Sequence, residues 1–318
     1  MATVTVYDKT KRRSADPDDL KNLIGPDKPT VWIDMTGPTD EDLVLLRDVF
    51  KFHPLAIEDT RNHWQRGKVD EYADYLFTIL NPVEWGTNRP LFRELDVFTG
   101  CNYVVTVHRS DEPLLENVQT RIERMNAMPS SGFLLYAILD IVVDGYFPVL
   151  DLLAEQIEDL GDQVLEQPNQ KMLNHLFDMK KTLVDMWRIL WPQRDIPNKI
   201  MHHDLPFLDE EALNHYLRDV SDHLMWIAEM VSTFRDTLTG TLDLYMSAVS
   251  NRLNKVVNRL TIVTVLIGLL TVISGFYGMN FNDTWPPFGS DWGVPFVLTL
   301  MVGLVTGLLL LFKKLDWL

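Results

Sequence analysis

Leu260–Met279 reads LTIVTVLIGLLTVISGFYGM, twenty residues without a charged side chain. A second uncharged stretch, Val294–Phe312, reads VPFVLTLMVGLVTGLLLLF. About 20 apolar residues in an α-helix cross the hydrocarbon core of a bilayer. Because a pair of uncharged runs this long is rare in soluble domains, the sequence predicts two transmembrane helices, at residues 260–279 and 294–312.

The residues around these stretches predict their orientation. Basic residues precede the first stretch and follow the second, at Arg252, Lys255, Arg259, Lys313 and Lys314. The connecting segment, 280–293, contains none. Because Lys and Arg accumulate on the cytoplasmic side of membrane proteins, we expect both chain ends in the cytoplasm, an external loop at 280–293 and a cytoplasmic basic tail at 313–318.

The residues before the first stretch form an acidic body. Residues 1–259 carry a net charge of −15, out of −16 for all 318 residues. An acidic surface repels phosphate and attracts cations, so we expect divalent cations as partners and no nucleic acid. The single cysteine, Cys101, excludes a disulfide framework. Because the N-terminus lacks an apolar signal core, we expect a cytoplasmic body and a multi-pass protein of the inner cell membrane.

The acidic body changes character along its length. Residues 1–130 alternate strand-like and helix-like runs and predict a cytoplasmic α/β domain. Residues 131–207 predict a long helical hairpin, and 208–259 a cytoplasmic stalk helix that continues into the first span. No proline occurs between Pro206 and Pro286, which predicts one helix of about 70 residues, roughly 100 Å long. The fold class expected is an α+β membrane protein whose long helix needs neighbouring helices for stability.

Polar residues and glycines recur along this predicted helix at heptad spacing. We name these ten positions the seam: Asp243, Ser247, Ser250, Asn254, Val257, Thr261, Thr264, Gly268, Thr271 and Gly275. Positions 3.5 residues apart face one direction in a left-handed supercoil. Nine of the ten are polar or glycine, and only Val257 is not.

Two interpretations of the seam compete. Glycine and threonine let membrane helices approach closely, so the seam is consistent with simple helix packing. Alternatively, identical helices around an axis would turn these hydroxyls into a water-filled pore. The polar stripe continues past the predicted bilayer to Asp243, where close packing would favour apolar residues, and this favours the pore. No phosphate-binding loop for an ATP-driven pump is present, and no reactive Ser or Cys with a base indicates an enzyme.

The first span ends in Tyr277-Gly278-Met279-Asn280-Phe281. A Gly-Met-Asn motif there, followed by a short loop and a second C-terminal span, resembles the CorA family of magnesium and cobalt transporters. The segments 52–59, 65–69 and 216–223, and the tail 313–318, are similar to family segments in the same order. The resemblance covers nearly the whole chain.

The resemblance implies a homopentameric channel with a funnel-shaped cytoplasmic part, in which the first span lines the pore. It implies a selectivity filter at Gly278, Met279 and Asn280, with Gly278 supplying the permissive backbone of the turn. The matching pore-lining positions are Asp243, Ser250, Asn254, Val257, Leu260, Gly268 and Thr271, and the pore interpretation of the seam adds Thr261 and Thr264 to the predicted lining. The matching carboxylates that sense magnesium between subunits are Glu58, Asp59, Asp140 and Asp219.

The implied function is uptake of Mg²⁺, and of Co²⁺, down the membrane potential under control of intracellular Mg²⁺. Mg²⁺ gives up its water reluctantly, and a ring of neutral Asn280 amides can hydrogen-bond a hydrated ion without stripping it. Two features depart from the family pattern. The loop lacks the Met-Pro-Glu-Leu of many members, so Asp283 or Asp291 would have to replace its glutamate. Gly268 stands where members place a bulky gate, so we expect the narrow point lower, near Val257 and Leu260.

Two alternatives stay open at this point. One is a zinc-transporting relative with the same fold and topology. The other is a membrane-anchored metal sensor without transport, for which the polar seam would have no use.

Overall fold

The structure is a computed structural model. It describes residues 2–8, 11–110, 112–124, 129–166, 168–202, 205, 207–208, 211–279, 285, 287, 291–315 and 317. The chain forms two compact units, which are described separately. Unit 1 comprises residues 1–162 and 171–240, and unit 2 comprises residues 163–170 and 241–318.

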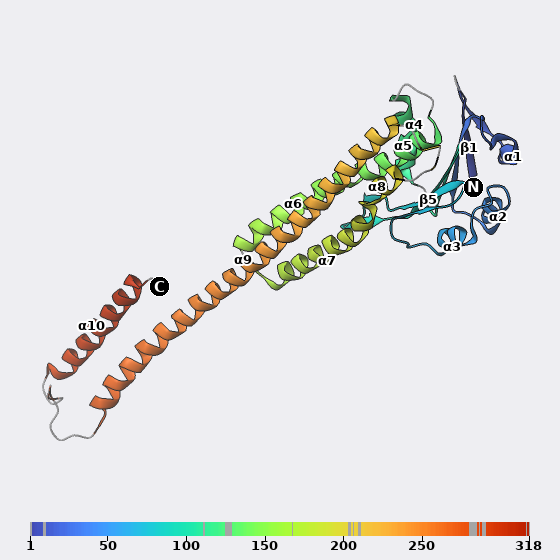
Figure 1. The fold of residues 1–318 in the computed structure, drawn as a ribbon. Helices are drawn as coiled ribbons and strands as arrows, with labels where there is room; N and C mark the ends of the chain where they lie inside the picture. Colours follow the sequence, from blue (N-terminus) through green and yellow to red (C-terminus); the bar gives the residue numbers. More distant parts are fainter. Residues whose placement is uncertain are drawn as a thin grey trace. The chain divides into compact units, whose positions relative to one another are not determined.

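Unit 1 contains a mixed sheet, beside which the helices α1 Leu20–Leu23, α2 Asp40–Asp48 and α3 Pro54–Asn62 lie (Figure 1). Its seven described strands have the order β2-β1-β3-β9-β8-β5-β4. Their bounds are β1 Ala2–Asp8, β2 Lys11–Ala15, β3 Thr30–Thr36, β4 Lys68–Glu71, β5 Tyr75–Leu80, β8 Leu95–Gly100 and β9 Tyr103–His108. β3 and β9 pair in parallel, and the other neighbours pair antiparallel. A separate hairpin pairs β6 Val83–Trp85 with β7 Pro90–Phe92.

Helices cover both faces of this sheet. One side carries the short elements η1 Pro17–Asp19 and α1 and the helices α2 and α3. Apolar residues of α1, α2 and α3 pack against the sheet there and form a core rich in aromatic side chains. Phe52 stacks on Phe98 in this core, with ring centroids 4.2 Å apart. On the other side, α5 Ser131–Asp144 contacts β8 and β9 and packs beside α4 Pro113–Arg124. Because α5 lies between sheet and helices, most of its residues are buried, which explains its lack of a polar face.

Local sequence signals explain several helix ends. The Thr39 side chain accepts from the backbone N–H of Asp42, and the Asp42 side chain accepts from the N–H of Thr39, which is a capping box. α3 begins with Pro54, whose missing N–H costs nothing at the first helical position. α3 ends at two consecutive residues with left-handed backbone, His63 at φ 44° and Trp64 at φ 67°, which is uncommon for residues other than glycine.

Long helices pack at heptad spacing in unit 1. They are α6 Tyr146–Glu166, α7 Gln170–Gln193 and the first part of α9 Glu211–Tyr277, with the short α8 Ile196–Met201 between α7 and α9. Phe147 of α6 packs on Trp226 of α9 at 5.1 Å between ring centroids, and Trp187 of α7 lies under Arg235 of α9. Ser221 and Ala228 of α9 are buried beside eight larger apolar residues that recur every three or four positions: Leu213, Leu217, Val220, Leu224, Ile227, Val231, Phe234 and Leu238. This spacing is typical of coiled-coil packing.

Unit 2 contains the remainder of α9 and α10 Gly293–Lys314. By length and composition, three described helical segments are apolar enough to cross a membrane: Ser131–Val164, α9 and α10. The apolar window of Ser131–Val164 is 72% buried inside the protein, whereas those of α9 and α10 are only 6% buried. The first therefore belongs to the protein core, and the other two contain the predicted spans.

The structure confirms the predicted fold class, an α+β protein with an N-terminal α/β domain, a long helix and two C-terminal apolar helices. It differs from the sequence-based expectation in details. The helical hairpin predicted at 131–207 is divided at Gly145 into α5 and α6, and its next long helix, α7, includes Pro192 in its last turn. Within the predicted α/β domain, Asn81 and Pro82 separate β5 from β6.

Candidate cation pathway and metal-binding residues

The seam lies on the side of α9 away from its packed face. The packed heptad positions continue into unit 2 at Thr241, Tyr245 and Ile262, which are buried at 5%, 6% and 4% exposure. Asp243 and Thr264 each follow such a position by two residues, which turns them by about 200° around the helix. The nine predicted pore-lining residues are exposed in the subunit, except Thr261, which is half-buried. Apart from Thr261, the seam is therefore not covered by other described residues of the same chain and is accessible to water, lipid or another subunit.

The threonine hydroxyls of the seam are hydrogen-bonded in a uniform way. Thr261, Thr264 and Thr271 donate to the backbone carbonyl oxygens four residues earlier, at 2.9, 2.8 and 2.8 Å. Each hydroxyl proton is thereby occupied, and the oxygen presents only its lone pairs outward. At Gly268 and Gly275, nothing lies within 4 Å of an added Cβ, so these positions leave open space beside the helix. The described seam within the span is a row of hydrogen-bond acceptors.

The end of α9 is closed by a tight backbone turn. The N–H of Gly278 donates to the carbonyl of Ser274 at 2.9 Å, and a Cβ at Gly278 would lie 3.1 Å from that oxygen. Gly278 does not adopt a left-handed φ, so the permissive backbone expected of this glycine is not used here, and a Cβ would be in tight contact with the Ser274 carbonyl. Met279 is 55% exposed. Asn280 and Asp283, and most of the predicted loop 280–293, lie outside the described residues.

Two aromatic contacts connect α9 with α10 at this end. The Tyr277 hydroxyl donates to the carbonyl of Trp285 at 3.1 Å. The Trp285 ring contacts Phe296 of α10 edge to face, at 5.7 Å between centroids. Large aromatic side chains of this kind accumulate at membrane–water interfaces.

One of the predicted sensing acids belongs to a buried charged cluster in unit 1. Asp140 of α5 is only 2% exposed and forms an ion pair with Arg121 of α4 at 2.9 Å. Asp144 also pairs with Arg121, and Asp140, Asp144 and His223 each offer an atom within 4.8 Å of the others. Burial raises the pKa of Asp140, and the charge of Arg121 opposes that rise. The cluster has the residue types of a metal site, but its strongest contact is an ion pair.

The other three predicted acids lie near the surface. Asp219 is exposed on α9, one helical turn before His223, and its charge and that of Asp140 both act on the buried Tyr136 hydroxyl. Glu58 is exposed on α3. Asp59 is half-buried and pairs with Lys68 at 2.7 Å. Burial lowers the pKa of Lys68, but hydrogen bonds to Asp59 and Asp70 outweigh that effect and raise it. Among the described contacts, none joins the α3 acids to Asp140 or Asp219.

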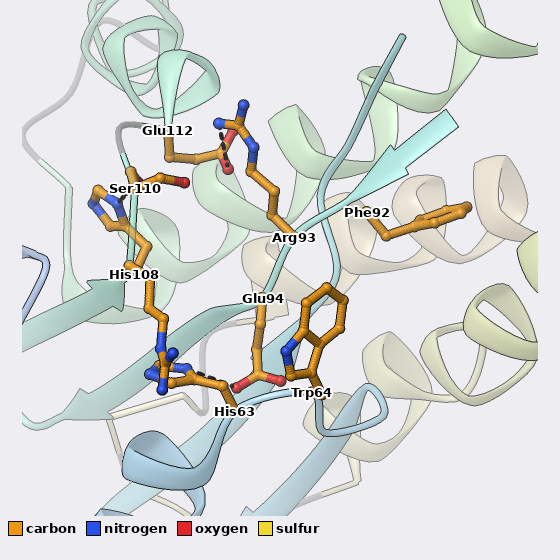
Figure 2. Close-up of a pocket in the computed structure, with 9 residues that line it drawn as sticks. His63, Trp64, Phe92, Arg93, Glu94, His108, Ser110 and Glu112 are labelled. Carbon is orange, nitrogen blue, oxygen red and sulfur yellow. Dashed lines mark hydrogen bonds and ion pairs between the residues drawn. The ribbon is translucent and has the colours of Figure 1, made fainter. Parts of the chain in front are cut away.

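A pocket of about 180 Å³ opens beside the end of α3. In Figure 2 the His63 ring and the Glu94 carboxylate point toward each other at its edge, and Trp64 lies beside them. His63 Nδ1 and Glu94 Oε1 are 3.3 Å apart, and Glu94 Oε2 accepts from the N–H of Gln65. Burial, and then the charge of Arg109, lower the pKa of His63, whereas burial raises that of Glu94.

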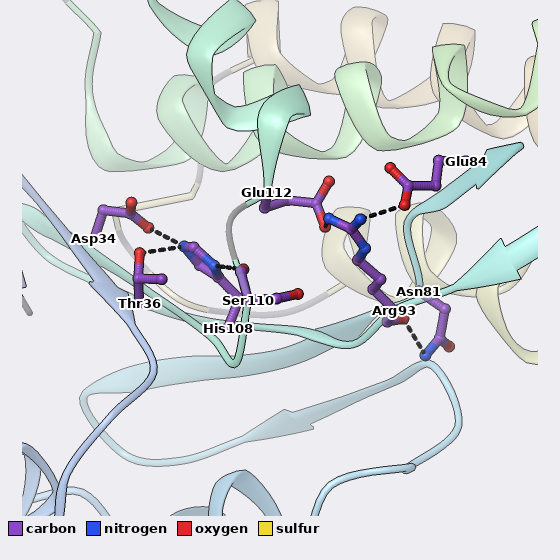
Figure 3. A network of polar contacts seen from close by, with 8 residues as sticks. All are labelled: Asp34, Thr36, Asn81, Glu84, Arg93, His108, Ser110 and Glu112. Carbon is purple, nitrogen blue, oxygen red and sulfur yellow. Dashed lines mark hydrogen bonds and ion pairs between the residues drawn. The ribbon is translucent and has the colours of Figure 1, made fainter. Parts of the chain in front are cut away.

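A second polar network continues from this pocket (Figure 3). His108 Nε2 lies 3.0 Å from Asp34 Oδ1, and His108 Nδ1 lies 2.6 Å from the carbonyl of Ser110. Because both ring nitrogens face acceptors, the doubly protonated ring fits best. Burial lowers the pKa of His108, but the hydrogen bond and charge of Asp34 outweigh it, so the pKa is raised. On the other side of the network, Arg93 pairs with Glu84 and Glu112.

Sequence reasoning missed the partners of the predicted acids. Asp140 and Asp144 are four residues apart on α5, as are Asp219 and His223 on α9. Such spacing puts acids and histidines on one helix face and is a readable signal. The cluster of His63, Glu94 and Asp96 combines a helix end with a strand, and no local spacing indicates it.

These features define a class: a membrane protein in which an acidic α/β unit shares one long helix with a two-helix apolar unit. Residues 27–314 match the family described as CorA-like Mg²⁺ transporter protein. The chain is 33% identical over 293 residues to the cobalt/magnesium transport protein CorA of Thermotoga maritima, covering 90% of this chain and 83% of the relative. The chain belongs to the CorA family.

Solved structures share the fold. The complete structure of the CorA magnesium transporter from Methanocaldococcus jannaschii has a TM-score of 0.84 and 22% identity, covering 100% of this chain and 99% of the other. The ZntB cytoplasmic domain from Vibrio parahaemolyticus has a TM-score of 0.64 and 12% identity, covering 78% of this chain and 98% of the other. At these identities the likeness concerns the fold alone.

Proposed function

We propose that this protein transports divalent metal cations, Mg²⁺ and Co²⁺, into the cytoplasm down the membrane potential. Membership of the CorA family and the transport named for the Thermotoga relative support this function. No energy source beyond the potential is required, because a dication that crosses 100 mV, inside negative, gains roughly 4–5 kcal/mol. The protein acts as a transporter and not as an enzyme.

The row of outward-facing acceptors along α9 carries the proposal. A hydrated cation presents the hydrogens of its water shell, which donate to threonine oxygens whose own protons are occupied. The row stands opposite the packed face, where a pore needs it. The proposed lining consists of Asp243, Ser250, Asn254, Val257, Leu260, Thr261, Thr264, Gly268 and Thr271, with Gly278, Met279 and Asn280 as the selectivity filter.

A pore requires several copies of the chain around one axis. We infer a homopentamer, in which the spans 260–279 and 294–312 cross the cell membrane, residues 1–259 and 313–318 lie in the cytoplasm and 280–293 lies outside. The exposure of α9 and α10 supports association, since large apolar side chains such as Leu260, at 65% exposure, need either lipid or a neighbouring subunit.

Intracellular Mg²⁺ closes the channel in this proposal. Glu58, Asp59, Asp140 and Asp219 would share bound Mg²⁺ between subunits, so that metal neutralises facing carboxylates and its loss lets repulsion loosen the ring. The exposed Glu58 and Asp219 are available for such contacts. Asp59 would have to exchange Lys68 for metal, and Asp140 would have to share its carboxylate with Arg121.

Two other functions remain to be separated from this one. A zinc-transporting relative would use the same cytoplasmic fold, to which the likeness with the ZntB domain is relevant. A membrane-anchored sensor would bind metal without moving it. The acceptor row argues against the sensor, since an anchor gains nothing from polar positions on an exposed helix face.

Isotope uptake by vesicles containing the reconstituted protein tests the proposal. We expect entry of labelled Mg²⁺ that rises with an inside-negative potential and is competed by Co²⁺ more strongly than by Zn²⁺. Asn280→Ala is expected to abolish selective Mg²⁺ entry, because it removes the neutral amide at the end of the seam. Asn251→Ala, an exposed amide of α9 outside the seam, is the matched control.

The outcomes separate the alternatives. Competition led by Zn²⁺ would favour the zinc transporter, and metal binding without uptake would favour the sensor. Mg²⁺ influx at the wild-type rate in Asn280→Ala, with the oligomer intact, would contradict the assignment of Asn280 to the selectivity filter.

A further inference from the structure

Asp96 is a buried acid whose carboxylate has no hydrogen-bond partner among the described residues. Its side chain comes from β8, is 1% exposed, and neither oxygen has a partner. The Thr60 hydroxyl lies near it and slightly counteracts the large rise that burial causes in the pKa of Asp96, but this hydroxyl donates to the carbonyl of Ala56 at 3.1 Å. A buried polar group without a partner is costly and calls for an explanation.

Two further ligand types surround this carboxylate. His63, at the end of α3, and Glu94, just before β8, each offer an atom that lies within 4.8 Å of an Asp96 oxygen and of the other. The side chains of His63 and Glu94 are only 9% and 7% exposed. The three groups therefore converge in a shielded space and do not belong to a solvated acidic surface.

The distance between the ligand atoms of His63 and Glu94 fits binding of one metal ion by both. Two ligands that are each about 2.1 Å from a tetrahedral ion lie about 3.4 Å apart. His63 Nδ1 and Glu94 Oε1 are 3.3 Å apart. One imidazole with two carboxylates suits first-row transition metals, whereas Mg²⁺ and Ca²⁺ favour sites made of oxygen alone.

We propose that His63, Glu94 and Asp96 form a transition-metal site in unit 1, which binds Zn²⁺ or Co²⁺. The site differs in residues and in ligand chemistry from the four acids proposed to sense Mg²⁺. With both carboxylates ionised, a dication leaves the cluster without net charge, so the nearby Arg109 meets no net repulsion. The hydrogen bond from the Gln65 N–H holds the second Glu94 oxygen and orients the first.

An entry path leads to the site from outside. His63 and Glu94 line the pocket of about 180 Å³ together with Trp64 and Arg109. In Figure 2 the His63 ring and the Glu94 carboxylate point toward each other, and the buried Asp96 offers an oxygen within 4.8 Å of both ligand atoms. An ion can thus reach the cluster without unfolding of the sheet. Because His63 directly follows α3, bound metal would also hold the end of the helix that carries Glu58 and Asp59.

Cobalt spectroscopy of the full-length protein in detergent tests this site. The protein is stripped of metal, supplied with millimolar Mg²⁺ to occupy oxygen-only sites, and titrated with Co²⁺. We expect one equivalent to develop the intense visible absorption of four- or five-coordinate Co²⁺, and Zn²⁺ to displace it. His63→Gln and Asp96→Asn are expected to weaken this binding on the order of 100-fold or more. His215→Gln, an exposed histidine of α9, should leave it unchanged.

A second measurement guards against variants that fail to fold. X-ray absorption of wild-type protein with one equivalent of Zn²⁺ should show a single imidazole in the first coordination shell. A shell of oxygens alone, no intense absorption with Co²⁺, or the same absorption in both folded variants would each overturn the proposal. Because the readout is bound metal and not uptake, this result and the result of the transport experiment are independent.

Discussion

In unit 1, aromatic side chains such as Phe77 and Phe98 are completely buried, whereas in unit 2 Leu260 and Val302 are 65% and 66% exposed. Both units contain many large apolar side chains, so the difference lies in what surrounds those side chains. Unit 1 completes its core within one chain. Unit 2 leaves many of its apolar side chains on the surface of the single chain, as a helix that faces lipid does.

Charges show the same contrast. Unit 1 contains buried ionisable groups, and some of them form ion pairs: Asp140 pairs with Arg121, and His108 pairs with Asp34. The apolar parts of α9 and α10, at 260–279 and 294–312, contain no charged residue at all. A buried charge inside a protein can be matched by a neighbour, but a charge facing lipid cannot. Exposure of a side chain therefore has opposite consequences in the two units.

The largest effect is expected when the same charge is placed at equally exposed positions of both units, which tests whether exposure has opposite consequences in them. Leu304 of α10 is 40% exposed and Leu91 of β7 is 42% exposed. Leu304→Arg is expected to cost about 2.5–3.5 kcal/mol of membrane insertion, as arginine does at the centre of a span. Leu91→Arg should change folding by less than about 0.5 kcal/mol. Carbonate extraction of membranes and the yield of assembled protein measure the difference, and equal yields would contradict it.

Thiol labelling sharpens the comparison within unit 2. In a background with Cys101→Ser, cysteines at Thr264 and Thr271 are expected to react with water-soluble reagents in the open channel. Cysteines at Leu266 and Leu270, which are half-buried, should stay unlabelled. The rate of modification in vesicles is the measurement. Equal modification rates at all four positions, or no modification at the two threonine positions, would favour the interpretation that the seam serves only helix packing.

The sensing acids test whether unit 1 responds to metal as a charged surface or through specific residues. Asp59→Asn with Asp219→Asn is expected to raise the Mg²⁺ concentration that protects the cytoplasmic part from protease by about tenfold. A Kd of about 1 mM corresponds to about −4 kcal/mol, so loss of two carboxylates removes much of such weak binding.

The matched control for this double variant is Asp70→Asn with Asp222→Asn, which makes the same change in charge. Uptake in the Asp59 and Asp219 variant should also be less inhibited by internal Mg²⁺. An unchanged magnesium titration of protease protection would remove Asp59 and Asp219 from the sensor and leave the pore assignment intact.

The smallest expected effect concerns the pairing of His108 with Asp34. Because the folded pKa of His108 is raised above its ordinary value of 6.5, its contribution to stability is complete below that pH and is lost as pH rises through the folded pKa. Asp34→Asn should therefore lower the free energy of unfolding by about 1 kcal/mol at low pH and less at high pH. Thermal unfolding between about pH 5.5 and 8.5 measures this, with His215→Gln as control. A pH-independent loss would contradict the pairing.

The features that could be predicted from the sequence were those that depend on residues close to one another in the chain. The uncharged stretches and the proline-free helix with its heptad pattern each depend on local spacing, and the structure contains the corresponding elements. Strands β2, β4 and β7 have a weak sequence signal: β2 and β4 are short and polar, β7 has only three residues, and all three depend on pairing with a neighbouring strand.

The clusters of charged residues were beyond prediction for a different reason. Asp96 looks like an ordinary strand residue, and only the packing of α3 on the sheet brings it to His63. The Arg121 partner of Asp140 likewise comes from another helix. Such contacts depend on tertiary packing, which hydrophobic periodicity does not specify at the level of single side chains.

The hydrogen bonds of Thr261, Thr264 and Thr271 have one more consequence, for the sign of the ion. An anion is solvated by hydrogen-bond donors, and these hydroxyls have none left to give, because each proton is held by a carbonyl of its own helix. A chloride ion among such helices would meet lone pairs on every side, with the backbone N–H groups of the helix already engaged. Rejection of anions would then require no charged residue in the membrane, and would follow from the direction in which three hydroxyl groups point.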